Sequence, residues 1–193
     1  MHFTEAIAHF LESLCAPEPE KKQFAKVEFQ TEPYSVSLFH WVYHIYRMSK
    51  ISPSGIISTC ILLDRIRLAF PTLHFSNLNV RRLFLIGAMV ISKVYEDVTY
   101  CNKDWVVISH NSFTLHQINQ MEWELLVLLN FMVSVSLEEF TSFSHFLLRD
   151  YHVHMPISLA PLSAVHHSQR PTPQKDSVGY VEFYVPSQNK RQP

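Results

Sequence analysis

The segment 79–97 constrains the fold most, because a helix over these residues is apolar on nearly all of its sides. A helix without a polar face is stable only where other elements surround it. The sequence therefore predicts that residues 79–97 form the central helix of their domain. Its apolar residues are Val80, Leu83, Phe84, Leu85, Ile86, Ala88, Met89, Val90, Ile91 and Val94.

Glycine and proline are distributed as in an α-helical domain. The chain of 193 residues has only 3 glycines, which is few for a protein built on β-turns. Most of its 11 prolines lie in 17–33 and 156–193, and none lies between Pro71 and Pro156. Because proline interrupts helices, the long proline-free stretch favours an all-α domain.

Capping signals and apolar periodicity place the other predicted helices. Ser52 is an N-cap candidate, and Pro53 follows at the first helical position. The capping boxes are Thr114 with Gln117 and Ser136 with Glu139. The predicted helices span 2–15, 35–50, 52–70, 79–97, 102–110, 114–131 and 136–152.

The composition argues against several functional classes. A net charge of −1 gives no general attraction to nucleic acid or to an anionic membrane. The 3 cysteines are widely spaced and odd in number, which does not suit a disulfide framework or a zinc ribbon. The first residues carry Glu5 and Glu12 and lack a basic leader, and the apolar runs are shorter than the roughly 18 residues of a membrane span. We therefore expect a soluble intracellular protein of the cytoplasm or nucleus, without a cofactor.

Two charged residues of opposite sign interrupt the apolar faces of two predicted helices. Lys93 lies in the segment 79–97, and Glu122 lies in the apolar stripe of the segment 114–131. A buried charge without a partner is costly. Two interpretations remain open at this point. Either Lys93 extends to solvent and Glu122 marks the edge of the stripe, or the two pair at the rim of the core and offer hydrogen bonds to another molecule.

A series of short motifs runs through residues 33–150. The motifs are Pro33 with Ser35, Asp64-Arg65, Asn79-Val80-Arg81-Arg82-Leu83, Ser92-Lys93, Glu96-Asp97, Tyr100-Cys101-Asn102 and Asn119-Gln120-Met121-Glu122. In their order and spacing they resemble the cyclin box, and within it the P/U-type cyclins, the single-box relatives of the phosphate-response cyclin. One departure is the stretch 107–113, which replaces a Val-Gly-Gly loop and has no glycine. Contacts made by that loop are therefore not carried over.

The resemblance implies an all-α fold whose centre is a five-helix cyclin box at 33–152, with flanking N- and C-terminal helices. An N-terminal helix and linker would occupy 1–32. A proline-rich and mostly irregular tail would occupy 153–193, which is too short for a second box.

The resemblance also implies a function, that of a non-catalytic regulatory subunit that binds and activates a cyclin-dependent protein kinase. In cyclins a Lys of the third box helix and a Glu of the fifth contact the kinase, and they match Lys93 and Glu122. The implied partner is the kinase, with no nucleic acid, membrane or small-molecule substrate. The residues assigned to kinase binding are Lys93, Glu122, Met89, Glu96 and Asp97, and those assigned a structural role are Asp64 and Arg65.

Other functional classes have weaker signals. The motifs of serine hydrolases, P-loop enzymes and dinucleotide-binding enzymes are absent from the sequence. His40 and His44 have the i, i+4 spacing of zinc ligands but no accompanying acidic residue, so no metal site is predicted. A cyclin-like module that acts in transcription by binding DNA or general transcription proteins remains the alternative. Its candidate basic cluster is Arg65, Arg67, Arg81 and Arg82.

Thr172 in the tail is a predicted phosphorylation site, because Thr172-Pro173-Gln174-Lys175 resembles the sites of cyclin-dependent kinases. Phosphorylation by the bound kinase would add about −1.5 to −2 charge beside Arg170 and Lys175. We expect mass spectrometry to find phosphate on Thr172 after the purified complex is incubated with ATP. A complex that modifies neither Thr172 nor a peptide of this sequence would contradict the assignment.

Overall fold

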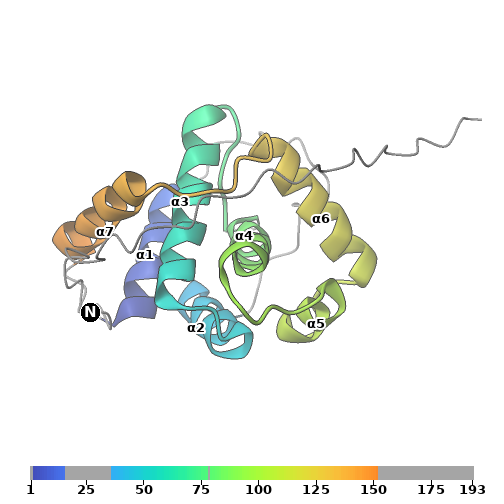
Figure 1. Ribbon diagram of the computed structural model, residues 1–193. Helices are drawn as coiled ribbons and strands as arrows, with labels where there is room; N and C mark the ends of the chain where they lie inside the picture. The colour runs from blue at the N-terminus through green and yellow to red at the C-terminus, as the bar shows by residue number, and fades with distance from the viewer. Residues whose placement is uncertain (1, 16–35, 78, 152–193) are drawn as a thin grey trace, which may run out of the picture. The chain divides into compact units, whose positions relative to one another are not determined.

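The computed structural model describes residues 2–15, 36–77 and 79–151, and every regular element in these ranges is an α-helix (Figure 1). The all-α fold class is therefore confirmed. The predicted tail at 153–193, with Thr172, lies outside the described residues, as do the predicted domain boundaries at 33 and 152. The helices are α1 (Phe3–Leu14), α2 (Leu38–Ser49), α3 (Pro53–Ala69), α4 (Val80–Tyr95), α5 (Asn102–Ile108), α6 (Leu115–Leu128) and α7 (Leu137–Tyr151).

The predicted capping signals start the helices where expected. The Ser52 hydroxyl accepts a hydrogen bond from the Gly55 N–H, with Pro53 at the first position of α3. Thr114 and Gln117 form the predicted capping box of α6. The box of α7 is also formed, because Ser136 N–H donates to Glu139 Oε2 and Glu139 N–H donates to Ser136 Oγ.

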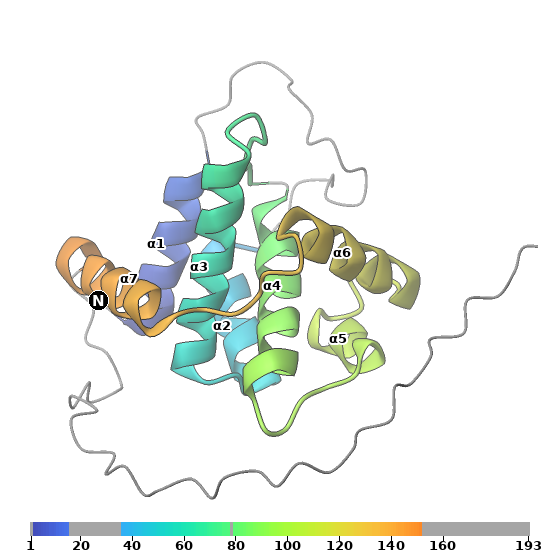
Figure 2. The same ribbon diagram turned by 45° about the horizontal axis from the view of Figure 1, so that its top comes forward.

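The helix α4 is the central helix, as its composition predicts. All residues from Val80 to Ser92 are buried. Figure 1 shows α4 end-on with α2, α3, α5 and α6 around it, and α4 packs against α2, α3 and α6. The last turn leaves the core, because Lys93, Val94 and Tyr95 are exposed. The end of the central helix therefore carries side chains to the surface. Figure 2 shows α4 from the side, with its end continuing into the loop that leads to α5.

The helices α3 and α4 approach each other closely at Gly87. A Cβ added at Gly87 would lie 3.0 Å from Cγ2 of Thr59 and 3.8 Å from Cδ2 of Leu63. Because Gly87 has no side chain, the two buried helices can pack backbone against side chain at this point. Gly87 therefore sets the spacing between the helices that make the most extensive contact in the domain.

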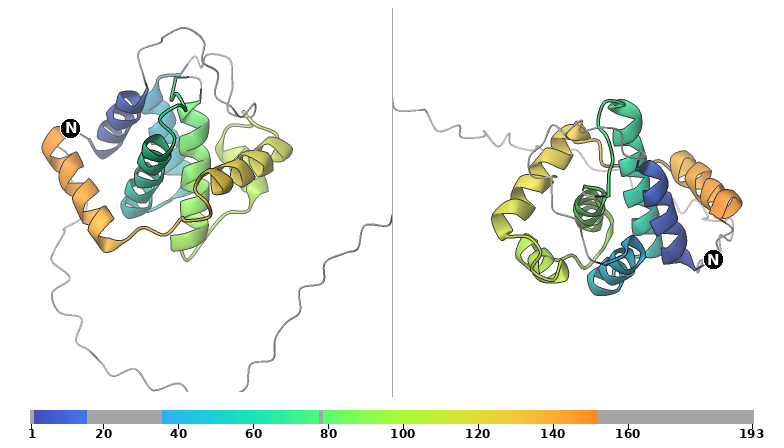
Figure 3. Two further views of the ribbon diagram at one scale, coloured as in Figure 1. Left: turned by 90° about the horizontal axis from the view of Figure 1, so that it is seen from above. Right: turned by 180° about the vertical axis from the view of Figure 1, so that it is seen from behind.

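The flanking helices α1 and α7 extend the core beyond the five helices α2 to α6. The helix α1 packs on α2 and α3, and α7 packs on α3 and α1 (Figure 3). The rings of Phe10 and Phe143 meet edge to face with their centroids 5.1 Å apart. None of the helices in the three described ranges is long and apolar enough to cross a bilayer.

The loop between α5 and α6 reverses direction without glycine. His110 and Asn111 both have a φ of 56°, in the left-handed region that glycine adopts more readily. The ring of His110 stacks on that of His44, with centroids 3.7 Å apart. The segment that departs from the Val-Gly-Gly pattern thus forms a tight turn held against α2, and the predicted helix 102–110 ends earlier, at Ile108.

We expect Gly87→Leu to destabilise the domain by about 1–3 kcal/mol, because the new side chain must push α3 away from α4. The matched control is Ala69→Leu, which adds the same side chain at an exposed position of α3 and should leave the midpoint nearly unchanged. Urea unfolding followed by circular dichroism measures both. Equal midpoints for the two variants would contradict the close approach.

Candidate functional site

Lys93, Asn102 and Glu122 form one polar cluster at the surface, and each comes from a different helix. Lys93 Nζ donates to Glu122 Oε1 and to Asn102 Oδ1, both at 2.5 Å. Asn102 Nδ2 donates to Glu122 Oε2 at 2.6 Å and to Asn119 Oδ1 at 2.8 Å. The last turn of α4, the first turn of α5 and the middle of α6 therefore meet in this cluster.

The cluster decides between the two open interpretations of Lys93 and Glu122. Their side chains are 31% and 19% exposed, and they form an ion pair at the rim of the core. The pairing interpretation is therefore confirmed as geometry. A partly exposed ion pair contributes at most about 1 kcal/mol to folding. So small a contribution to stability does not by itself account for two charged residues on otherwise apolar helix faces.

The cluster has hydrogen-bonding capacity left for another molecule. A lysine ammonium has three N–H donors, and two of them are used within the cluster. Each oxygen of Glu122 accepts one hydrogen bond in the cluster and has room for a second. The site can therefore donate to a carbonyl and accept from an N–H of an adjacent chain.

Apolar side chains are exposed next to both charged residues. Val94 and Tyr95 follow Lys93 and are 45% and 47% exposed. Trp123 follows Glu122 and is 59% exposed, and its ring contacts that of Phe131 edge to face. Exposed aromatic and aliphatic groups beside a few directed polar groups are typical of protein–protein contact surfaces.

The other residues assigned to kinase binding have different surroundings. The side chain of Met89 is fully buried in the core, so a direct contact with a partner does not fit its position. Glu96 is half-buried, and its Oε1 accepts from the N–H and the hydroxyl of Ser52, at 2.9 and 2.7 Å. Glu96 therefore caps the start of α3 instead of facing outward, and only Asp97 is exposed as predicted.

The roles of Asn102 and Asn119 were missed, although both residues belong to the motifs of the resemblance. A signal was present for Asn119, which lies one helical turn before Glu122 on the same face of α6. Asn102 gave no such signal, because its contacts join it to residues that are distant in the chain. Its position at the start of α5 was the only local indication.

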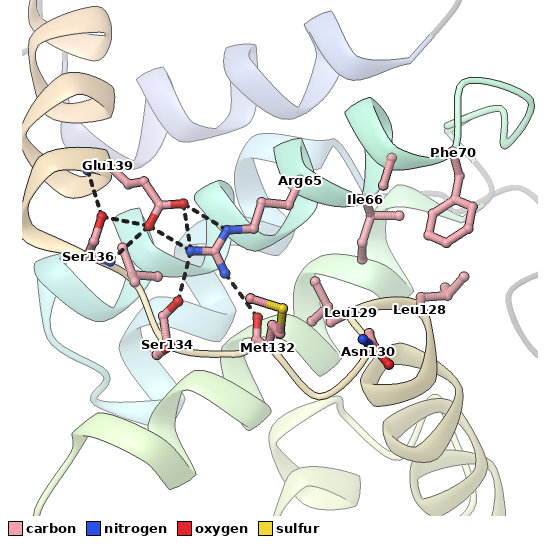
Figure 4. Close-up of a pocket in the computed structure, with 12 residues that line it drawn as sticks. Arg65, Ile66, Phe70, Leu128, Leu129, Asn130, Met132, Ser134, Ser136 and Glu139 are labelled. Atoms are coloured by element: carbon pink, nitrogen blue, oxygen red, sulfur yellow. Dashed lines mark hydrogen bonds and ion pairs between the residues drawn. The ribbon is translucent and has the colours of Figure 1, made fainter.

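Arg65 has the predicted structural role, but its neighbour Asp64 does not share it. The Arg65 guanidinium donates to both carboxylate oxygens of Glu139, at 2.7 and 2.8 Å from Nη2 (Figure 4). It also donates to the carbonyls of Met132 and Ser134, at 3.0 and 2.8 Å. Arg65 therefore ties α3 to α7 and to the linker before it. Asp64 pairs with Arg67 on its own helix, so it ties no helices together.

The Arg65–Glu139 pair borders a surface cavity of about 570 Å³. Figure 4 shows the apolar side chains of Ile66, Phe70 and Leu129 on the other side of this cavity. The charged groups at its edge already bond to each other and to carbonyls. The cavity is thus lined partly by apolar side chains, and the two charged groups at its edge are engaged with each other.

The metal and DNA-binding alternatives find no support in the described residues. His40 Nδ1 bonds to Ser37, and both ring nitrogens of His44 bond elsewhere, to the Ile108 carbonyl and to His110. Within the ranges that the structure describes, no group of three or more His, Cys, Asp or Glu could hold a metal ion.

The four arginines of the candidate DNA-binding cluster do not form a basic surface. Arg65 and Arg67 pair with carboxylates. Arg81 and Arg82 are only 6% and 8% exposed, and the guanidinium of Arg82 lies over the Phe113 ring. A surface that binds phosphates needs accessible cations, so this alternative loses its main evidence.

Comparison with known proteins identifies a family. The family model described as Cyclin matches residues 6–133, which include the whole polar cluster. Cyclin-U1-1 of Arabidopsis thaliana is 31% identical over 124 residues, which cover 64% of this chain and 58% of that protein. Cyclin-U4-1 of the same plant is 25% identical over 161 residues, 78% of each chain. The PHO85 cyclin-like protein psl1 of Schizosaccharomyces pombe is 27% identical over 118 residues, 61% of this chain and 48% of that protein.

These matches support the resemblance to P/U-type cyclins. The matched region of the chain spans about three fifths of Cyclin-U1-1 and about half of the fission-yeast protein.

We expect Glu139→Gln to make stability less dependent on pH. Hydrogen bonds from the Ser136 N–H and hydroxyl, followed by the Arg65 guanidinium, hold the pKa of Glu139 below its usual value of 4.5. The folded state therefore favours the carboxylate, and this stabilisation is present above pH 4.5 and lost as the pH falls through the folded-state pKa. At neutral pH the variant should be less stable by about 0.5–1 kcal/mol, because the pair is partly exposed.

Urea unfolding between pH 3 and pH 7 tests this expectation. The difference between the wild type and Glu139→Gln should shrink as the pH is lowered. Glu138→Gln is the matched control, because it removes an exposed carboxylate from the adjacent position. A difference for Glu139→Gln that stays constant with pH would show that the charge of Glu139 is not what stabilises the contact.

Proposed function

The chain belongs to the cyclin family, and from this premise we propose that it binds and activates a cyclin-dependent Ser/Thr protein kinase as its regulatory subunit. The observation that carries the proposal is the polar cluster of Lys93, Asn102 and Glu122. It brings together the two residues that match the kinase-binding Lys and Glu of cyclins. Cyclins are a regulatory and non-catalytic family, so the chain would supply binding energy and the kinase the chemistry.

The cluster suits the backbone of a kinase segment just before its C-helix. Lys93 would use its third N–H to donate to a backbone carbonyl, and Glu122 would accept from a backbone N–H. The exposed side chains of Val94 and Trp123 would pack against the kinase beside these bonds. An active kinase needs an ion pair between a β-strand Lys and a C-helix Glu, so a surface that holds the C-helix in place raises activity.

The relatives support the partner class without identifying the kinase. The name of the fission-yeast relative connects that protein with the cyclins of PHO85. A kinase of the same general class is the proposed partner of this chain, inside the cell in the cytoplasm or nucleus. No partner of another class is proposed, since the candidate DNA-binding arginines are paired or buried.

We expect Lys93→Ala and Glu122→Ala to fold normally and to lose the kinase. In the free chain the pair is partly exposed, so each substitution should cost at most about 1 kcal/mol of stability. In a complex the remaining charge would be buried without its partner, which costs about 2–5 kcal/mol of binding. Circular dichroism and thermal melting measure the first effect. Capture of kinases from a native lysate, identified by mass spectrometry, measures the second.

Lys103→Ala is the matched control, because Lys103 is an exposed cation on α5 that lies next to the cluster in sequence. It should capture the same kinase as the wild type. If both cluster variants still captured and activated the kinase at wild-type levels, the assignment of the site would be wrong.

A further inference from the structure

We propose that Asn102 is a positioning residue that holds Lys93 and Glu122 in the arrangement a kinase recognises. This inference rests on the proposed function. The side-chain amide of Asn102 contacts both charged groups, with Oδ1 toward Lys93 Nζ and Nδ2 toward Glu122 Oε2. Lys93 and Glu122 also meet directly, so the three side chains close a ring of hydrogen bonds.

The chemistry of the site favours a carboxamide at this position. One end of the group must accept from an ammonium and the other must donate to a carboxylate, and an amide does both. A carboxylate would accept from Lys93 but repel Glu122 at a separation of only 2.6 Å. A hydroxyl or a methyl group would leave at least one of these contacts unmade.

The backbone of Asn102 is held in place by the start of α5. Asn102 is the first residue of this helix, after the N-cap residue Cys101, whose N–H donates to Asp104 Oδ2 at 2.9 Å. Hydrogen bonds from the side chain and the N–H of Cys101 lower the pKa of Asp104, because both stabilise its carboxylate. The helix itself packs on α6 and α2, so Asn102 approaches the cluster from a fixed direction.

Asn119 fixes the orientation of the amide. Its Oδ1 accepts from Asn102 Nδ2 at 2.8 Å, so the nitrogen end of Asn102 faces two acceptors on α6. A flipped amide would place its oxygen against both of these oxygens. The same orientation of the Asn102 amide therefore satisfies Lys93, which bonds to Oδ1, and the two acceptors on α6, which bond to Nδ2.

Positioning matters because Lys and Glu side chains are long and flexible. A side chain that becomes ordered only on binding lowers the affinity, by about 0.5–1.5 kcal/mol for each side chain, whereas hydrogen bonds already hold Lys93 and Glu122 in the free chain. Losing the Asn102 amide would leave each of them with a single contact in the cluster. We expect Asn102→Ala to weaken kinase binding roughly 5- to 150-fold, the range that ordering two such side chains implies.

Asn102→Asp separates positioning from a role in helix stability. An acidic residue in the first turn of α5 favours the helix, so this variant should melt at or near the wild-type temperature. The carboxylate would nevertheless repel Glu122 and disrupt the ring of hydrogen bonds. If Asn102 served only to stabilise the fold, Asn102→Asp would keep its kinase binding. If Asn102 positions Lys93 and Glu122, Asn102→Asp should lose kinase binding at least as strongly as Asn102→Ala.

The experiment has one arm in the free chain and one in the complex. In the free chain, an NMR spectrum selective for lysine ammonium groups reports on Lys93, whose signal is identified by its absence from Lys93→Arg. The signal should be sharp in the wild type and lost through fast exchange in both Asn102 variants. In the complex, the captured kinase is titrated with the wild type, Asn102→Ala, Asn102→Asp and the control Lys103→Ala. Asn102→Ala should have a smaller effect in a chain that already carries Lys93→Ala, because only Glu122 is then left for Asn102 to position.

The two arms separate the failure of this inference from that of the proposed function. If the wild type captures no kinase, the proposed function fails, and the NMR arm still tests whether Asn102 orders Lys93. If the wild type binds the kinase and Lys93→Ala does not, the site is correct. In that case, wild-type affinity for both Asn102 variants, together with an unchanged Lys93 signal, would overturn the positioning role.

Discussion

The burial of α4 on all sides is the constraint on which the rest of the structure depends. A helix with thirteen consecutive buried residues, from Val80 to Ser92, has to be enclosed by its neighbours. The absence of a side chain at Gly87 lets α3 approach closely enough to complete that enclosure. The enclosure ends one turn before the end of the helix, where Lys93 reaches the surface. The site is thus located where the central helix leaves the core.

Two polar clusters in the molecule show how a structural ion pair differs from one available for binding. Arg65 is engaged by Glu139 and by two carbonyls, and these contacts fasten α7 and its linker to α3. Lys93 is engaged by Glu122 and Asn102 but has a donor to spare. Both arrangements place opposite charges on separate helices. They differ in what the cation binds: Arg65 donates to two backbone carbonyls as well as to Glu139, and so fastens a linker, whereas Lys93 donates to side chains alone in the described residues.

Local patterns in the sequence predicted the helices and the central position of α4, and they singled out Lys93 and Glu122 as charges on apolar faces that could form a pair. An N-cap such as Ser52 acts on residues only a few positions away, so it can be recognised in the sequence. A charged residue in an apolar stripe can be recognised in the same way, and the cost of burying it alone implies a partner. The contacts of Glu96 with Ser52 and of Asn102 with Glu122 join residues 44 and 20 positions apart. Such contacts depend on how the helices pack and where the loops between them run. The apolar periodicity of a single helix carries no information about either. The burial of Met89 was visible in the same apolar pattern, but its assignment to a contact surface came from the resemblance and not from that pattern.

The single spare donor of Lys93 has a consequence for stoichiometry. A group that can serve one acceptor at a time makes its partners mutually exclusive, so any proteins that use this cluster must compete for it. The number of complexes in a cell would then be bounded by the number of copies of this chain. Relative abundance, as well as affinity, would decide which partner is engaged.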